Sequence, residues 1–353
     1  MSDAAGAPRT APVGACPACG ATGADAMFTL PDRLHSTPGR FGYRRCRGCR
    51  TVFQDPRVVA ADLALCYPDD YLPHAPSSAA PAGARPMAGV RDALRGAIQA
   101  RVKREPVAPR WRLAARLLAA IRPLREQAFY SLLDELHPRG GGGRRALDVG
   151  CGAGRVMSEL GRAGWEVDGV EWDAAAAATA ARVTGRPVWA GDFREVDLPR
   201  GAYDLILLNH VFEHLADPRA ALARIAELLA PGGRAVLVHP NPDSLGARRF
   251  QDCWFHWDPP RHLIFPTPAA LSALAATPEW SRLHVRTTAR SAPWVFNNSR
   301  AYRAGRSTDW SEPSRGDRLL GRWEAVLVAV GLPRGEEIVC TLRKAERPAT
   351  AHG

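Results

Sequence analysis

A glycine-rich segment preceded by an acid is the part of this sequence best suited to binding a ligand. Asp148 is followed by Gly150, Gly152 and Gly154, between a short apolar strand and a helix-forming stretch. Glycines let the backbone turn tightly and approach a ligand without a clash at Cβ. A dinucleotide-binding loop needs its third glycine at position 155, which holds Arg155. The loop therefore fits a different ligand.

Polar residues also end the strands that follow this loop. Glu171 ends the next strand, where a carboxylate can accept hydrogen bonds from a ribose diol. Asp192 follows the third strand and can accept a bond from an exocyclic amine, with Phe193 against the face of an adenine. Asn209 closes a fourth, fully apolar strand. These positions lie at the carboxyl ends of strands, where open α/β sheets bind ligands.

The alternation of apolar runs and helical stretches predicts the sheet that carries these residues. Strands alternating with helices indicate a parallel sheet covered on both faces. Two more strands are expected near the C-terminus. The predicted strands are 146–149, 165–170, 188–190, 203–208, 234–238, 284–289 and 337–342.

These segments resemble the successive motifs of class I S-adenosylmethionine-dependent methyltransferases, over roughly residues 144–343. The matching stretches are Leu147–Gly154, Glu171, Asp192, Asn209–Leu215 and Leu229–Val236. The resemblance implies a Rossmann-like α/β fold with a seven-stranded sheet whose last strand is antiparallel. It also implies S-adenosylmethionine as methyl donor and S-adenosylhomocysteine as product.

The resemblance also assigns cofactor-binding residues by position. Asp148 and the glycines would hold the methionine part, Glu171 the ribose, and Asp192 with Phe193 the adenine. The complete predicted set is Asp148, Gly150, Gly152, Gly154, Glu171, Trp172, Asp192, Phe193 and Asn209.

Two Cys-x-x-Cys pairs near the N-terminus, Cys16 with Cys19 and Cys46 with Cys49, have the spacing of a tetrahedral zinc site. Four thiolates indicate a closed, structural Zn²⁺ site in a zinc-ribbon-like module. The arrangement is similar to the N-terminal zinc modules of some bacterial small-molecule methyltransferases. The alternative is unbound or redox-active cysteines. Cys66 is expected to be a core residue.

Histidines near the predicted acceptor side could remove a proton from a hydroxyl acceptor. His262 is the first choice for a base, with His214 and His210 as further catalytic candidates. The aromatic segment after the fifth strand suggests a lid that shapes an acceptor pocket, and its predicted acceptor-binding residues are Arg261, Trp257 and His256. The alternatives are structural histidines and a rigid lid in which Arg261 pairs with Asp258.

Charge is concentrated in one connecting region. The net charge is +11, and residues 85–125 hold eleven Lys or Arg against two acids, which is 11 − 2 = +9. We expect two basic amphipathic helices there, which either cap the catalytic domain or make weak contact with a membrane surface. The expected organisation is a disordered leader (1–14), a zinc-binding module (15–72), a linker with the basic helices (73–142), the methyltransferase domain (143–345) and a tail (346–353).

The leading hypothesis is a small-molecule methyltransferase acting on a hydroxyl or carbon of a sugar, lipid or natural-product intermediate. An RNA methyltransferase gripping phosphates with the zinc module and basic helices is an alternative, but the fourth strand lacks the Asn-Pro-Pro-Tyr pattern of many base-methylating enzymes. A non-catalytic zinc-dependent binding protein is a third. No apolar run of 18 residues and no export signal are seen, so we expect a cytoplasmic enzyme without a transmembrane segment.

Overall fold

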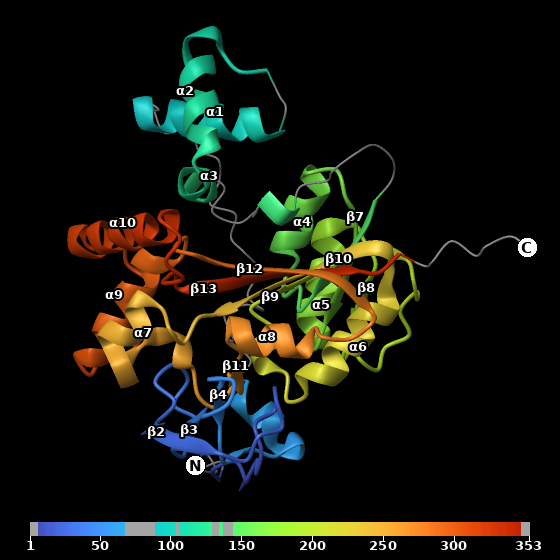
Figure 1. Ribbon diagram of the computed structural model, residues 1–353, viewed down its shortest axis with the longest axis vertical. Helices are drawn as coiled ribbons and strands as arrows, with labels where there is room; N and C mark the ends of the chain where they lie inside the picture. Colours follow the sequence, from blue (N-terminus) through green and yellow to red (C-terminus); the bar gives the residue numbers. More distant parts are fainter. Residues whose placement is uncertain (1–5, 68–88, 104–105, 129–133, 137–143, 347–353) are drawn as a thin grey trace, which may run out of the picture.

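The protein is described by a computed structural model, which contains a large sheet, a smaller N-terminal sheet and a group of connecting helices (Figure 1). The structure describes residues 6–67, 89–103, 106–128, 134–136 and 144–346. The expected linker at 73–87 lies outside these residues, as does the expected tail from 347 onward.

The large sheet has seven strands in the order β12-β13-β10-β9-β6-β7-β8. Strand β13 is antiparallel to both of its neighbours, and the other neighbouring pairs are parallel. This confirms the predicted α/β fold with a reversed last strand. The strands are β6 (Arg145–Val149), β7 (Glu166–Glu171), β8 (Val188–Ala190), β9 (Tyr203–Asn209), β10 (Leu229–Pro240), β12 (Trp280–Thr288) and β13 (Glu337–Lys344).

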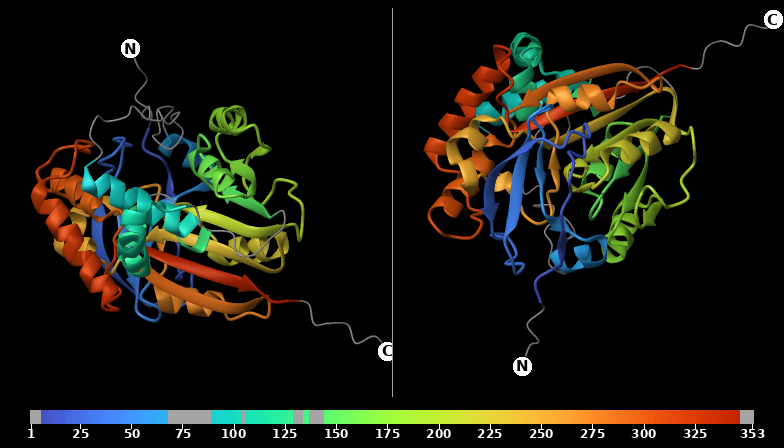
Figure 2. Two further views of the ribbon diagram at one scale, coloured as in Figure 1. Left: turned by 90° about the horizontal axis from the view of Figure 1, so that it is seen from above. Right: turned by 60° about the horizontal axis from the view of Figure 1, so that its bottom comes forward.

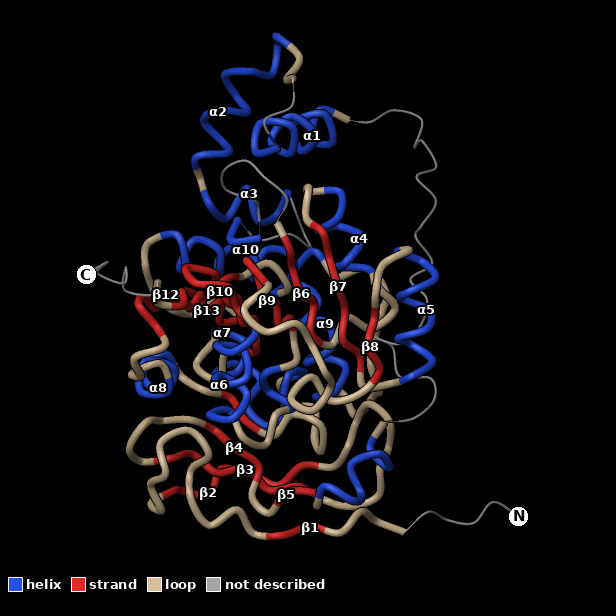
Figure 3. The backbone as a smooth tube through the Cα atoms, turned by 90° about the vertical axis from the view of Figure 1, so that its right-hand side faces the viewer, coloured by secondary structure: helices blue, strands red, loops and turns tan. Residues whose placement is uncertain are grey.

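Helices flank this sheet on both faces (Figure 3). Several begin at a side chain that accepts a hydrogen bond from the first turn, which satisfies a backbone N–H that lacks a helical partner. Asp173 caps α5 in this way, Asp217 caps α6 and Thr267 caps α8. The helices are α4 (Arg155–Arg162), α5 (Ala174–Thr184), α6 (Pro218–Leu228), α7 (Leu245–Phe250), α8 (Pro268–Leu274), α9 (Ala292–Arg303) and α10 (Arg315–Ala329).

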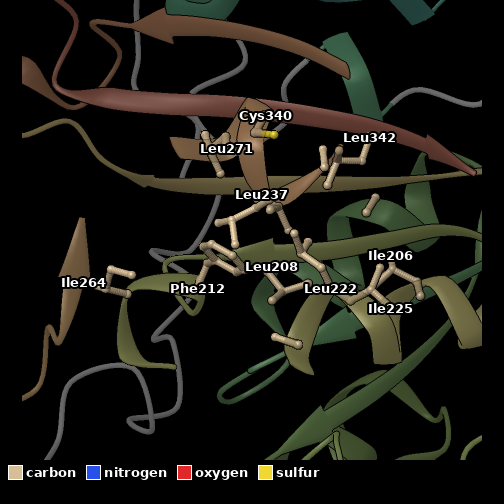
Figure 4. Packing of buried hydrophobic residues seen from close by; sticks show 14 of the residues in the cluster. Ile206, Leu208, Phe212, Leu222, Ile225, Leu237, Ile264, Leu271, Cys340 and Leu342 are labelled. Atoms are coloured by element: carbon tan, nitrogen blue, oxygen red, sulfur yellow. The ribbon is translucent and has the colours of Figure 1, made fainter. Parts of the chain in front are cut away.

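The apolar run of β9 is buried on both faces of the sheet. Ile206 and Leu208 lie beside Leu222 and Ile225 of α6 and Leu237 of β10 (Figure 4). The alternate residues of β9 belong to a second cluster with residues of α4, because successive side chains of a strand point to opposite faces. A central strand of a parallel sheet therefore needs apolar residues at every position.

The N-terminal sheet is completed by β11, a short strand from the segment that follows β10 of the large sheet. Its order is β11-β4-β3-β2, and Ile264 of β11 pairs with Phe53 of β4. Cys16, Cys46 and Phe53 share one buried cluster with the large sheet. The N-terminal strands therefore pack directly on the larger domain (Figure 2). The strands are β2 (Ala24–Leu30), β3 (Phe41–Cys46), β4 (Val52–Gln54) and β11 (Ile264–Phe265).

The prediction that residues 1–14 are disordered is wrong for the last part of that stretch. Strand β1 (Thr10–Ala11) pairs antiparallel with β5 (Arg57–Val58). The Arg9 guanidinium also donates to both carboxylate oxygens of Asp62, at 2.7 and 3.0 Å. Backbone pairing and this ion pair hold a stretch whose composition alone indicates disorder.

The basic region forms helices α1 (Val90–Lys103), α2 (Arg112–Ala120) and α3 (Arg122–Ala128), which lie on the side of the large sheet opposite the N-terminal sheet (Figure 1). In α2 the small residues Ala115 and Ala119 are buried, whereas Leu113 and Leu117 are exposed. No helix among the described residues combines the length and apolar character needed to span a membrane.

A buried arginine joins the N-terminal sheet to the segment that follows β10. The Arg261 side chain has 0% exposure, and its guanidinium donates to Asp32 at 2.8 Å and to Asp258. It also donates to the carbonyl oxygen of Cys66. Burial raises the pKa of the Asp32 carboxyl, but the bonds from Arg261 outweigh burial and lower that pKa to about 2.

We expect Asp32→Ala to lower the free energy of unfolding by about 3–5 kcal/mol, because it leaves part of a buried guanidinium without a partner. Chemical denaturation of the full chain measures this. Asp25→Ala is the control, since Asp25 pairs with Arg47 at the surface and its loss should change little. Equal stability of the two variants would contradict the structural role of the Arg261 ion pairs.

Candidate active site

The loop between β6 and α4 adopts a conformation that requires glycine. Gly150, Gly152 and Gly154 have φ values of +69°, +52° and +85°. A Cβ at Gly150 would lie 2.4 Å from Cγ2 of Val211. The backbone therefore turns closely over the carboxyl end of the sheet, where it can contact a ligand.

Two carboxylates lie beside this loop. Glu171 accepts hydrogen bonds from the backbone N–H groups of Gly152, at 2.7 Å, and Asp173, at 3.1 Å. Asp148 is 2% exposed, and its Oδ2 has no hydrogen-bond partner among the described residues. Burial, followed by the charge of Glu171, raises the Asp148 pKa to about 8. A buried carboxyl with one unpaired oxygen beside the loop fits a ligand with a cationic donor, such as an ammonium group.

The other predicted cofactor residues lie in differing environments. Asp192 is held by the guanidinium of Arg194, and Asn209 Oδ1 accepts from Arg290 at 3.0 Å. Trp172 is 67% exposed. Phe193 is 3% exposed and packs in the core, so its ring does not fit the predicted stacking on an adenine.

Histidines from the ends of two strands and from the following segment gather at the carboxyl edge of the sheet. The rings of His210 and His256 stack with centroids 5.7 Å apart. His214 and His262 meet edge to face at 4.7 Å. The structure thus brings together four histidines that the sequence analysis selected, and His239 of β10, which it did not select, lies buried nearby against Phe212.

His210 is held between two buried carboxylates. Its Nδ1 lies 3.1 Å from Glu213 Oε1, and its Nε2 lies 3.1 Å from Glu337 Oε1. Burial lowers the pKa of His210, but the bonds to both carboxylates outweigh burial and raise that pKa to about 9. The residue also has φ of +57°, an uncommon conformation for a residue other than glycine. His210 is therefore a fixed imidazolium near neutral pH.

The acids that position His210 were not among the residues predicted from the sequence. Glu213 lies within the matched segment Asn209–Leu215, so its place three residues after His210 is a local signal. Glu337 and its ion-pair partner Arg290 come from distant elements. No local pattern links them to His210, and only the pairing of β13 with β10 brings Glu337 to this edge.

The predicted acceptor-binding residues are buried in packing contacts. The guanidinium of Arg261 is fully used by its ion pairs, so it is not available to bind an acceptor. Trp257 is 2% exposed and donates its indole N–H to the carbonyl oxygen of Gln251. His256 is also buried. These contacts fit the alternative of a rigid lid better than a direct role in acceptor binding.

The four N-terminal cysteines form one cluster. The Sγ atoms of Cys16 and Cys49 are 3.6 Å apart, and those of Cys19 and Cys46 are also 3.6 Å apart. Tetrahedral Zn–S bonds of about 2.3 Å place neighbouring sulfurs about 3.8 Å apart. The cluster therefore has the dimensions of a four-thiolate zinc site. Cys66 lies apart from it in the core, as predicted.

Comparisons with known proteins agree with this geometry. A family model described as a methyltransferase domain matches residues 121–278. An uncharacterised methyltransferase of Mycobacterium bovis is 31% identical over 155 residues, covering 38% of this chain and 78% of that protein. The ubiquinone biosynthesis O-methyltransferase of Alkalilimnicola ehrlichii is 33% identical over 112 residues, covering 29% of this chain and 44% of that enzyme.

The chain thus covers less than half the length of the first curated relative it matches. Among solved structures, geranyl diphosphate C-methyltransferase from Streptomyces coelicolor has a TM-score of 0.41 and 16% identity. That match covers 69% of this chain and 87% of the other.

We expect Gly150→Ala to lower the free energy of unfolding by about 1–3 kcal/mol, because alanine at positive φ is strained and its Cβ meets Val211. The matched control is Gly161→Ala in α4, where no atom lies within 4 Å of the new Cβ. That change should be neutral or stabilise by up to about 1 kcal/mol. Thermal unfolding measures the stability of both variants. An unfolding temperature of Gly150→Ala equal to that of the native protein would contradict the close contact between Gly150 and Val211.

Proposed function

This chain belongs to the class I S-adenosylmethionine-dependent methyltransferases, and we propose that it methylates a hydroxyl or carbon of a small molecule. The acceptor class is a sugar, a lipid or a natural-product intermediate. The names of the ubiquinone biosynthesis O-methyltransferases support a small-molecule acceptor. Bound S-adenosylmethionine supplies an electrophilic methyl group on a positively charged sulfur.

One observation carries this proposal. The unpaired carboxyl of Asp148 and the positive-φ glycine loop lie at the same sheet edge as the His210 cluster. A methyl transfer needs a donor site directly beside an acceptor site, because the enzyme works mainly by holding the two reactants in line. We propose that the carboxyl edge of β6 and β9 holds both sites.

Asp148 and the glycine loop are proposed to hold the methionine part of the cofactor. The carboxylate of Glu171 would accept from the ribose hydroxyls, as expected from its place at the end of β7. Asp192 is proposed to accept from the adenine amine. We do not propose Phe193 as an adenine platform, because its ring packs in the core.

On the acceptor side, His210 is the residue we propose to meet the substrate. Its side chain is 29% exposed, against 9% for His262. Both N–H groups of its imidazolium are donated to Glu213 and Glu337, which fix its orientation, so we propose that the ring faces the acceptor and places a positive charge beside an acceptor oxygen. The predicted role of His262 as base fits less well, because its side chain is more deeply buried than that of His210.

The exposed face of α2 favours contact with a membrane surface over RNA binding. Leu113 and Leu117 are exposed beside Arg112 and Arg116 on this short helix. Apolar side chains interleaved with cations suit the interface of an anionic bilayer, whereas nucleic-acid backbones are bound by cations and polar groups. We therefore propose weak membrane-surface contact as an accessory property.

We expect native protein to bind S-adenosylhomocysteine, and Glu171→Ala to weaken that binding on the order of 100-fold through loss of charged hydrogen bonds. Isothermal titration calorimetry measures both. Glu166→Ala is the matched control, since Glu166 is exposed at the other end of the same strand. No binding by folded native protein would contradict the proposed function and favour a non-catalytic binding protein. Unchanged affinity in Glu171→Ala would contradict only the ribose role.

We also propose that the four N-terminal cysteines hold a structural zinc ion. Cys49→Ser should then lose about one zinc per chain and unfold at lower temperature, because metal binding is coupled to folding. Cys253→Ser is the control, as this cysteine lies outside the cluster. Elemental analysis together with thermal unfolding tests this, and equal zinc content in the two variants would contradict a thiolate site.

A further inference from the structure

A second group of metal-ligating side chains lies within the histidine cluster. Glu213, His214 and His262 each place one ligand atom within 4.8 Å of the others. Two come from the turn after β9. The third comes from the segment that follows β10, residues 241–266, which is called the lid segment and is anchored by Arg261. The group is therefore assembled by two separate parts of the chain.

The hydrogen bonds of the two imidazoles determine which nitrogen is available. Nδ1 of His214 lies 3.0 Å from the carbonyl oxygen of Arg261 and 3.1 Å from the Tyr67 hydroxyl, which can accept from the same N–H. Nδ1 of His262 lies 2.7 Å from the carbonyl oxygen of His256. A carbonyl oxygen can only accept, so each Nδ1 carries the hydrogen. Each Nε2 is then a bare lone pair, and neither has a hydrogen-bond partner among the described residues.

This is the arrangement that metal-binding histidines commonly show. A metal-ligating imidazole almost always donates its second ring N–H to a carbonyl or carboxylate, which fixes the ring orientation. Both His214 and His262 already have that second bond, made to backbone oxygens. The ligand atoms are thus oriented before any ion binds.

Glu213 adds a carboxylate oxygen that also lacks a hydrogen-bond donor among the described residues. Its side chain has 0% exposure, and Oε2 has no hydrogen-bond partner among the described residues. Nε2 of His262 lies 3.9 Å from the other oxygen, Oε1, and 3.9 Å from Oδ2 of Asp258. Oε1 of Glu213 is bonded to His210 and Oδ2 of Asp258 accepts from Arg261, so among the described groups here Oε2 of Glu213 is the oxygen left without a donor. Burying such an oxygen is costly, and a cation bound between it and the imidazole lone pairs would remove that cost.

We propose that Glu213, His214 and His262 bind a divalent transition-metal ion with the ligand preference of Zn²⁺. Two imidazoles and one carboxylate suit zinc and similar ions rather than Mg²⁺ or Ca²⁺, which prefer all-oxygen sites. Three protein ligands leave coordination positions open, as in catalytic rather than structural sites. This ion is distinct from the one assigned to the four cysteines.

A metal ion at this site would also bind the acceptor, an inference that rests on the proposed function. Glu213 links the metal ligands to His210, the residue proposed to meet the substrate. An acceptor oxygen in an open coordination position would have its pKa lowered and would be oriented toward the donor site. The site therefore favours acceptors that present an ionisable oxygen, such as a hydroxyl or an enol.

The test uses full-length protein whose metal has been removed and replaced with Co²⁺. We expect about two ions per chain in native protein, one with a thiolate-to-cobalt charge-transfer band and one without it. Glu213→Gln and His262→Gln should each lose only the ion without the thiolate band. The matched control is His284→Gln, an exposed histidine of β12 outside the cluster, which should keep both ions.

A native chain that binds a single ion, with the thiolate spectrum only, would overturn the proposal. Retention of the second ion in both Glu213→Gln and His262→Gln would overturn it as well, and circular dichroism of each variant verifies its fold. Calorimetry with S-adenosylhomocysteine on the same native samples distinguishes a failure of the second metal site from a failure of the proposed function. Cofactor binding with a single metal ion would remove the second metal site alone, whereas two ions without cofactor binding would remove the methyltransferase assignment alone.

Discussion

The buried charge of Arg261 is the constraint on which the arrangement of the site depends. Its guanidinium has no exposed surface, so it requires carboxylates in place, and Asp32 and Asp258 supply them from two parts of the chain. The same residue offers its backbone oxygen to His214. One ion-pair network thus holds the N-terminal sheet, closes the lid segment and orients an imidazole of the acceptor side. Such a network tolerates little change, because removing any partner leaves an uncompensated charge in the interior.

The N-terminal sheet therefore belongs to the architecture of the candidate site. The Tyr43 hydroxyl lies 2.8 Å from the carbonyl oxygen of Trp257 and 2.9 Å from that of His262. The backbone pairing of β4 with β11 also joins the N-terminal sheet to the lid segment. A metal held by the cysteines would stabilise this sheet, and through Tyr43 and Asp32 it would also stabilise the position of the lid segment.

How far the sequence could predict this structure depends on the range of the interactions involved. The glycine loop, the apolar strand β9 and the two Cys-x-x-Cys pairs are local patterns, and the structure has the predicted strand, turn and sulfur cluster there. The pairing of Arg261 with Asp258 is local and was one of the alternatives, whereas its pairing with Asp32 was not predictable, because Asp32 lies 229 residues away. A charged residue that follows two prolines is equally consistent with a ligand-binding group and with a buried ion pair. Strand β11 has two residues, too few to show the alternation of apolar and polar residues that predicts a strand. It is recognisable as a strand only through its hydrogen-bonded pairing with β4.

The charges around the site also bear on the direction of the reaction. Asp148, Glu171, Glu213 and Glu337 lie at one sheet edge, where Arg290 pairs with Glu337 and the imidazolium of His210 contacts Glu213 and Glu337. An excess of carboxylates in a partly buried region favours ligands that bring positive charge. Transfer of the methyl group turns a sulfonium into a neutral thioether, so the product keeps less of this attraction than the donor had. The same carboxylates that would help to bind the cofactor would thus help to release the product.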